Sequence, residues 1–151
     1  MNGTAVLPGP TPPDITGSSV DFTNKVAFDT APKGQQFGSV LTPPQAAYAV
    51  GDKVSVQFWG AHPNNSYRTQ DSFLIVEKLD QGIFVPVAHD WDPETTFAWE
   101  RSGLANSKVT ITWDTSAVEP GTYRIRYKGN KKAVFNGIQP FEGSTDAFTV
   151  N

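Results

Sequence analysis

The two histidines, His62 and His89, are the residues of this sequence that come closest to catalytic chemistry. A hydrolytic triad needs a nucleophile and an orienting carboxylate beside such a histidine. Ser66, Ser72 and Ser102 stand at expected turns or strand ends, and none has the tight-turn context that exposes a catalytic serine. The sequence contains no cysteine, which excludes a thiolate nucleophile and a thiolate metal site. The residue types alone therefore indicate no active site.

Residues 89–94 read His-Asp-Trp-Asp-Pro-Glu and place one histidine next to three carboxylates. Oxygen-rich loops of this kind can bind Ca²⁺. The spacing fits no EF-hand, however, and the chain has only two histidines to offer a zinc ion. We favour a polar loop at the end of a β-domain, with a calcium loop as the alternative.

Four tryptophans could stack on sugar rings, as they do in carbohydrate-binding modules. Trp59, Trp99 and Trp113 fall inside expected strands, where we expect large aromatic side chains to be buried in the core. Trp91 lies in the expected loop between two aspartates and is the exception. A glycan-binding surface therefore stays open as an alternative, although it usually needs several exposed aromatic residues.

The net charge is −3 and the isoelectric point is near 5.2, which argues against binding to nucleic acid. Arg124, Arg126 and Lys128 alternate along one expected strand, so we interpret them as its solvated face. No run of 18 apolar residues predicts a membrane span. The first four residues, Met-Asn-Gly-Thr, lack the features of a signal peptide.

The elements that must position these side chains are strands. Twelve prolines and thirteen glycines disfavour a helical protein, and apolar residues alternate with polar ones at Val54, Val56 and Phe58. We predict an all-β, immunoglobulin-like antiparallel β-sandwich over residues 35–151, preceded by an extended proline-rich linker over residues 1–34. The expected strands include a hairpin over 73–88, two further strands at 97–100 and 109–113, one at 122–127 and one at 147–150. The Glu-Pro-Gly-Thr-Tyr segment at 119–123 resembles the turn and tyrosine that enter a late strand of immunoglobulin-like domains.

Eight segments, in order along the chain, resemble the C-terminal domain of the neutral (neutral/alkaline) ceramidases. They cover nearly the whole sequence, which makes the combined match specific although each piece is weak alone. The segments include Gly-Pro-Thr-Pro-Pro-Asp at 9–14, Gly-Gln-Gln-Phe-Gly-Ser-Val-Leu at 34–41, Ala-His-Pro-Asn-Asn at 61–65, the Trp91, Glu94, Thr95, Phe97 and Trp99 pattern, and Glu-Pro-Gly-Thr-Tyr-Arg-Ile-Arg-Tyr at 119–127.

The resemblance implies an accessory role. Neutral ceramidases hydrolyse ceramide to sphingosine and a fatty acid, with zinc bound in a larger N-terminal domain that supplies the catalytic residues. No zinc ligand or catalytic residue carries over to this sequence, so we expect no catalysis and no cofactor in this chain alone. The resemblance further implies a secreted, cell-surface or periplasmic protein, with the catalytic domain as its partner in the same chain or as a separate subunit.

The loops expected to contact that catalytic domain are residues 60–72 and 90–95, together with the linker. The candidate docking residues are His62, Asn64, Asn65, Arg68, Asp71 and Trp91. A second expected surface is a membrane contact through Ile83 and Phe84, or through Val134 and Phe135 beside Lys131 and Lys132. The alternatives left open are a free-standing module that binds a glycan, a lipid surface or a protein, and an independent enzyme.

Overall fold

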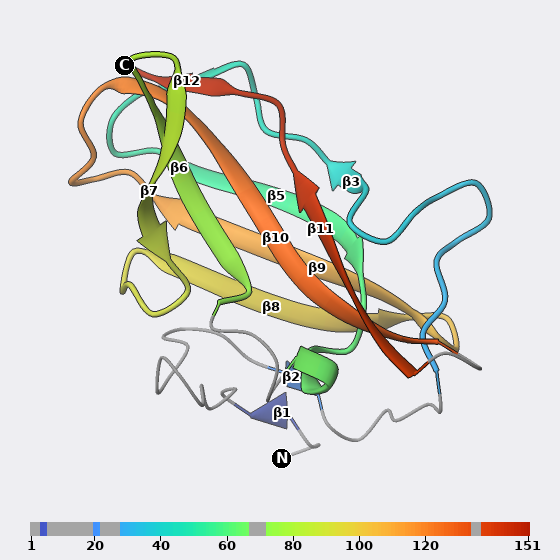
Figure 1. Ribbon diagram of the computed structural model, residues 1–151. Coiled ribbons are helices and arrows are strands. Elements are labelled where there is room, and N and C mark those ends of the chain that lie inside the picture. The colour runs from blue at the N-terminus through green and yellow to red at the C-terminus, as the bar shows by residue number, and fades with distance from the viewer. Residues whose placement is uncertain (1–3, 6–19, 22–27, 67–71, 134–136) are drawn as a thin grey trace.

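The structure, a computed structural model, describes residues 4–5, 20–21, 28–66, 72–133 and 137–151. Two sheets face each other in a sandwich (Figure 1). One sheet has the order β4 (Ala47–Tyr48), β12 (Phe148–Val150), β10 (Gly121–Ala133), β6 (Leu74–Asp80) and β7 (Ile83–His89), and β11 (Gly137–Ser144) also pairs with β10. The other has the order β3 (Val40–Thr42), β5 (Lys53–Gly60), β9 (Asn106–Asp114) and β8 (Thr95–Ser102).

The pairing confirms the predicted antiparallel sandwich. Adjacent strands of both sheets are antiparallel, apart from the parallel pair of β4 and β12. A separate pair, β1 (Thr4–Ala5) and β2 (Val20–Asp21), lies near one end, and β2 is in contact with β8. Within the described residues the one helical segment is the short 3₁₀-helix η1 (Pro63–Ser66), and no helix has the length and apolar character needed to cross a bilayer.

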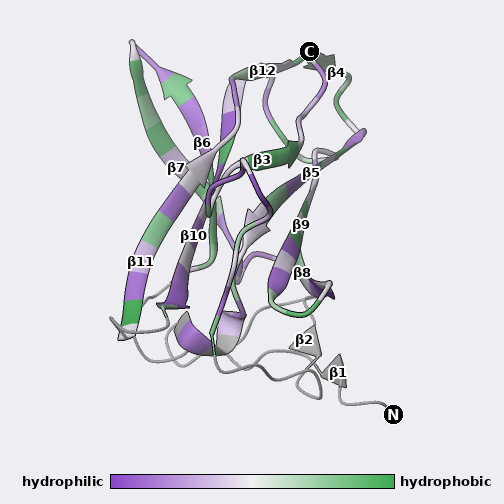
Figure 2. Cartoon of the chain, turned by 90° about the vertical axis from the view of Figure 1, so that its right-hand side faces the viewer, coloured by the Kyte–Doolittle hydropathy of each residue, from purple (hydrophilic) through white to green (hydrophobic). Residues whose placement is uncertain are grey.

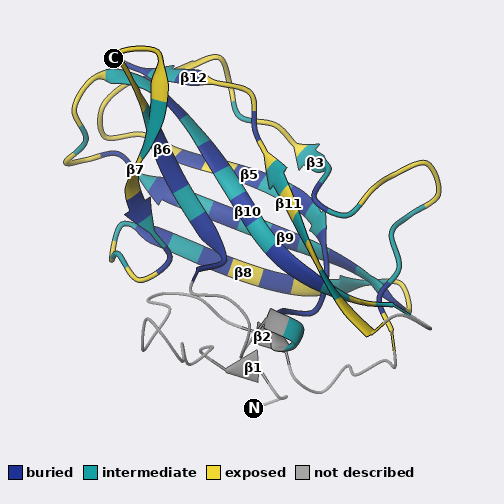
Figure 3. Cartoon of the chain, viewed as in Figure 1, coloured by how far each residue is buried: buried dark blue, intermediate teal, exposed yellow. Residues whose placement is uncertain are grey.

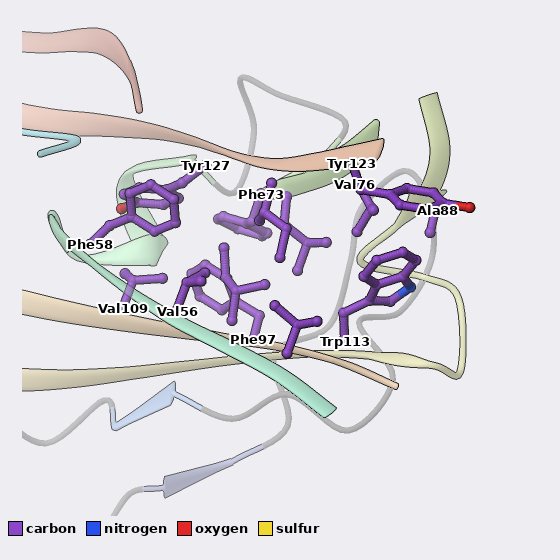
Figure 4. Packing of buried hydrophobic residues seen from close by; sticks show 14 of the residues in the cluster. Val56, Phe58, Phe73, Val76, Ala88, Phe97, Val109, Trp113, Tyr123 and Tyr127 are labelled. Carbon is purple, nitrogen blue, oxygen red and sulfur yellow. The ribbon is translucent and has the colours of Figure 1, made fainter. Parts of the chain in front are cut away.

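The core lies between the two sheets and is built from alternating positions of the strands. Val54, Val56 and Phe58 of β5 are fully buried, and the intervening residues of that strand are more exposed (Figure 3). Figure 4 shows the two layers meeting, with Trp113 beside Tyr123 at one end and Phe58 beside Tyr127 at the other. Burial of this apolar surface is the main driving force that holds the sheets together.

The turn before β10 supports the immunoglobulin-like assignment. The hydroxyl of Tyr123 donates a hydrogen bond of 2.6 Å to the backbone oxygen of Glu119, four residues upstream. A tyrosine that bonds back to the backbone at the entry of a late strand is a recurring feature of immunoglobulin-like sandwiches. The segment at 119–123 therefore forms the corner that its sequence predicts.

One expectation about a single side chain is wrong. Trp59 is half-buried and not in the core, because it neighbours the inward-facing Phe58 and so points outward, where Lys108 lies over its ring. Ile83 and Val87 are exposed, although they lie within the expected hairpin over 73–88. Figure 2 shows the reason: the β6–β7 hairpin extends away from the opposite sheet, which leaves part of its inner face uncovered.

The division into a linker and a sandwich at residue 34 stays a prediction, because residues 6–19 and 22–27 lie outside the described part. The residues just before that boundary are nevertheless attached to the sandwich. The backbone N–H groups of Asp29 and Thr30 donate to the carbonyl oxygens of Lys132 and Ala105.

Candidate docking surface

Asp29 is the centre of a buried polar cluster at the end of the sandwich where η1 lies. Its Oδ1 atom accepts a hydrogen bond from the backbone N–H of His62 at 3.2 Å. Its Oδ2 atom accepts from the Nδ2 of Asn65 and from the backbone N–H of Lys132, both at 2.7 Å. The carboxylate thus joins the chain before β3 to the loop after β5 and to the end of β10.

Arg101 supplies the positive charge of this cluster. Its Nη1 atom lies 3.7 Å from Oδ1 of Asp29, and both side chains are almost completely buried, with 3% and 2% exposure. The same nitrogen donates to the backbone oxygen of Ala105 and to Oγ of Ser107. Desolvation lowers the pKa of Arg101, and the nearby carboxylate of Asp29 partly offsets that shift. The Nε and Nη2 atoms of Arg101 are buried without a hydrogen-bond partner in the described part of the chain, so the charge depends on Asp29.

The candidate docking residues of loop 60–72 divide into those held inside the domain and those outside the described part. His62 is buried with its ring 4.4 Å from that of Trp99. The side chain of Asn65 bridges Asp29 and the backbone oxygen of Asn130. Both side chains therefore shape the loop from inside. The side chain of Asn64, and all of Arg68 and Asp71, lie outside the described residues.

Trp91 lies on a different loop, between β7 and β8, and is 37% exposed. Its ring stacks on that of His89, with the centroids 4.2 Å apart and the planes within 6°. The loop is connected to loop 60–72 through Asp90, whose Oδ2 accepts a 3.0 Å hydrogen bond from the backbone N–H of Phe73. Burial raises the pKa of Asp90. The structure thus joins the two predicted docking loops at the start of β6.

The acidic loop does not form a metal site in the described residues. Asp90 is buried beneath Phe73, and the Oδ2 atom of Asp92 accepts from the backbone N–H of His89 at 2.7 Å. No group of three histidine, aspartate or glutamate side chains in the described ranges converges as metal ligands do. The expectation that this chain alone binds no cofactor stays a prediction.

A cavity of about 240 Å³ opens between the β6–β7 hairpin and the loop after β9. Its lining is mainly apolar and includes Trp113, Tyr123 and Val118. Its charged side chains are Lys78 and Glu119, which form an ion pair at 3.1 Å, and Glu94.

The sequence matches one protein family along almost its whole length. The family described as "Neutral/alkaline non-lysosomal ceramidase, C-terminal" matches residues 1–150. Neutral ceramidase 2 of Arabidopsis thaliana is 37% identical over 99% of this chain and 21% of its own length. The neutral ceramidase of Pseudomonas aeruginosa is 40% identical over 91% of this chain and 21% of its own.

The fold agrees with a solved structure of the same kind. The crystal structure of neutral ceramidase from Pseudomonas aeruginosa superposes with a TM-score of 0.79 at 39% identity, covering 88% of this chain and 22% of that one. The chain therefore spans about a fifth of the length of these relatives. Identity, coverage and fold lead to one conclusion: this chain belongs to the family of C-terminal domains of the neutral/alkaline non-lysosomal ceramidases.

Proposed function

We propose that this chain is a non-catalytic accessory domain that docks on a ceramidase catalytic domain and stabilises it. The observation that carries the proposal is the match of residues 1–150 to a C-terminal domain that makes up about a fifth of its relatives. In this proposal the remaining part of such a chain hydrolyses ceramide to sphingosine and a fatty acid, and binds the zinc. By the same resemblance, the enzyme acts at the cell surface, in the periplasm or after secretion.

The geometry of the described residues supports a docking role. The buried cluster around Asp29 joins the described end of the expected linker to His62 and Asn65, so the described parts of two segments proposed to face the catalytic domain are held together. Rigid presentation lowers the entropy lost when an interface forms. His62 and Asn65 contribute by holding the loop in shape, and Trp91 contributes an exposed side chain on the adjoining loop.

The test is hydrolysis of a fluorescent ceramide by this chain alone, by a matching N-terminal catalytic domain alone, and by the two mixed. We expect no turnover by this chain and an increased rate for the mixture. Equal rates with and without this chain would remove the accessory role. Zinc-dependent turnover by this chain alone would show that it is an enzyme.

A contact with the lipid surface is a second candidate function, favoured by the exposure of the β6–β7 hairpin. Ile83 is 67% exposed, and Leu79 and Val87 are also exposed on the same hairpin. Phe84 is half-buried under the guanidinium of Arg124, 4.1 Å from its ring. Sedimentation with phosphatidylcholine vesicles tests this role: Ile83→Ser should reduce vesicle binding if the hairpin contacts lipid. The other expected membrane residues, Val134 and Phe135, lie outside the described part of the chain.

A further inference from the structure

In the loop that carries Trp91, Asp90 is buried and Asp92 is half-buried, whereas the tryptophan between them is exposed. Asp90 is buried and bonded to the backbone of Phe73, and Asp92 is bonded to the backbone of His89. Trp91, between them, is 37% exposed, whereas Trp99 and Trp113 are 4% and 2% exposed. Surface loops usually solvate their charges, so the reversed arrangement needs an explanation.

Hydrogen bonds within the loop hold this arrangement in place. The Oγ1 atom of Thr95 donates to the carbonyl oxygens of His89 and Asp92, at 2.6 and 3.0 Å. The backbone N–H groups of Asp92 and Thr95 close the turn by bonding to the carbonyls of His89 and Asp92. The loop is therefore ordered before any partner arrives, and binding through it requires little further ordering.

His89 fixes the plane of the exposed ring. The two rings stack within 6° at 4.2 Å, so one face of the indole is covered by the imidazole. His89 itself is held in β7 by its pairing with Ile75 of β6, and Ile75 is half-buried. A rigid tryptophan backed by neighbouring side chains is the residue type most often found at the energetic centre of protein interfaces.

The occupant that fits is the catalytic domain of the same enzyme. The relatives that contain this domain carry about four-fifths of their chain outside it, which provides a partner at high effective concentration. Two neighbouring elements also support this occupant. Asp90 bonds to the backbone of Phe73, which directly follows loop 60–72. Strand β2, which belongs to the expected linker, contacts β8, the strand that follows Trp91. Resting on the proposed function, we propose that Trp91 is the anchor residue of the interface with the catalytic domain, and that His89 positions it.

The experiment is a titration of this chain, labelled with ¹⁵N, with the unlabelled N-terminal catalytic domain, following the indole N–H signals. We expect the Trp91 signal to shift while the signals of the buried Trp99 and Trp113 stay in place. Trp91→Ala should weaken binding about 30-fold or more, which is the range of an interface hot spot. His89→Ala should weaken it about fivefold, because the ring stays but loses its support.

The matched control is Leu104→Ala, because Leu104 is 88% exposed in the turn between β8 and β9, away from the Trp91 loop. Its affinity should stay within about twofold of the unchanged chain, and the backbone spectrum of each variant shows that it is folded. Binding with an unmoved Trp91 signal, or an unchanged affinity of Trp91→Ala, would overturn the anchor while leaving the proposed function intact. No binding of the unchanged chain would overturn both. A Trp91 signal that responds to phosphatidylcholine vesicles and not to the catalytic domain would assign the residue to a lipid surface instead.

Discussion

At the scale of single residues, the carboxylate of Asp29 connects segments that are far apart in the chain, which its local sequence does not predict. It bonds to His62, Asn65 and Lys132 and neutralises Arg101, and these residues come from three separate parts of the chain. A buried charge without its partner is strongly destabilising, because the remaining charge cannot be hydrated. The stability of this end of the domain therefore depends on one side chain.

Asp29→Ala should lower the free energy of unfolding by about 3 to 5 kcal/mol, because it leaves the Arg101 guanidinium buried and unpaired. Urea denaturation followed by tryptophan fluorescence measures the change. Glu100→Ala is the control, since Glu100 neighbours Arg101 on β8 but is exposed, and it should change the stability by less than about 0.5 kcal/mol. Equal effects of the two variants would show that the buried pair is not important.

Gly143 is required for a close contact between backbones. A Cβ atom at this position would overlap the carbonyl oxygen of Gly38, in the turn that precedes β3. Gly143→Ala should therefore force β11 away from that turn and cost about 2 to 3 kcal/mol or more of stability. Gly82→Ala is the comparison: its Cβ meets open space, and its φ of 82° predicts a cost of about 1 kcal/mol. Thermal unfolding of both variants should rank them in this order.

At the scale of elements, strands β6 and β10 are linked by charges on their outer face as well as by the ladder. Glu77 is nearly buried and accepts from Nε of Arg124 at 2.6 Å and from Nη1 of Arg126 at 3.2 Å. Arg126 also pairs with Glu142 of β11, whose side chain is half exposed. The expected solvated face thus carries a charge network that crosses three strands.

Removing the carboxylate of Glu77 should lower the stability of the domain more than removing that of Glu142. Glu77→Ala should destabilise the domain by about 3 kcal/mol, because two arginines lose a well-shielded partner. Glu142→Ala should cost less than about 1 kcal/mol, because its pair with Arg126 is open to solvent. Chemical denaturation at low and high salt separates them further, since salt screens the exposed pair more strongly. A larger loss for Glu142→Ala would contradict this assignment.

The buried tyrosines of β10 predict how stability depends on alkaline pH. Burial raises the pKa of Tyr127, which is fully enclosed, and also raises that of Tyr123. Because the folded pKa exceeds the unfolded value of about 10, this stability is complete below pH 10 and is lost as pH rises further. Each such proton contributes a slope of about 1.4 kcal/mol per pH unit.

Tyr127→Phe should therefore make the unfolding midpoint less sensitive to pH above about 10, although it removes the hydrogen bond from the backbone N–H of Ala61, worth about 1 kcal/mol. Urea midpoints between pH 8 and 11.5 test this. An unchanged alkaline slope in the variant would mean that Tyr127 ionises without unfolding the domain.

Strand β5 was predictable from its clear alternation, and the β6–β7 hairpin from two apolar runs joined by the turn at Asp80-Gln81-Gly82. Strand β11 was missed, because Pro140 and two glycines weaken its pattern and its pairing with β10 compensates only in the folded chain. Trp59 was expected in the core, although alternation with the buried Phe58 places it on the outer face of β5. The exposure of Ile83 has no such local signal, since it depends on how far the hairpin extends beyond the opposite sheet. The local sequence pattern thus predicted several of the strands, but not which of their side chains the opposite sheet covers.

At the scale of the whole molecule, the family could be predicted from the order of short motifs, whereas the cluster at Asp29 could not. Its partners are far away in sequence, with Lys132 more than one hundred residues from Asp29, and no local pattern links them. The predicted docking residues follow from loop position alone. The structure shows that His62 and Asn65 face inward and leaves Trp91 exposed, a distinction that depends on tertiary contacts.

The buried contacts of Asp29 imply that the folded unit begins before residue 34. The predicted boundary at residue 34 would remove Asp29, but burial and hydrogen bonding of the affected segment should decide whether a truncation is tolerated. A chain of residues 28–151 keeps every contact that Asp29 makes in the cluster, and a chain of 35–151 loses all of the contacts made by Asp29. We expect the longer one to retain the wild-type Asp29 contribution and the shorter one to be less stable by about 3 to 5 kcal/mol, as for Asp29→Ala. Denaturation of the two truncated chains measures the difference. Equal stability would place the boundary at 34 and make residues 28–34 part of the linker. A difference of the expected size would show that the folded domain includes Asp29.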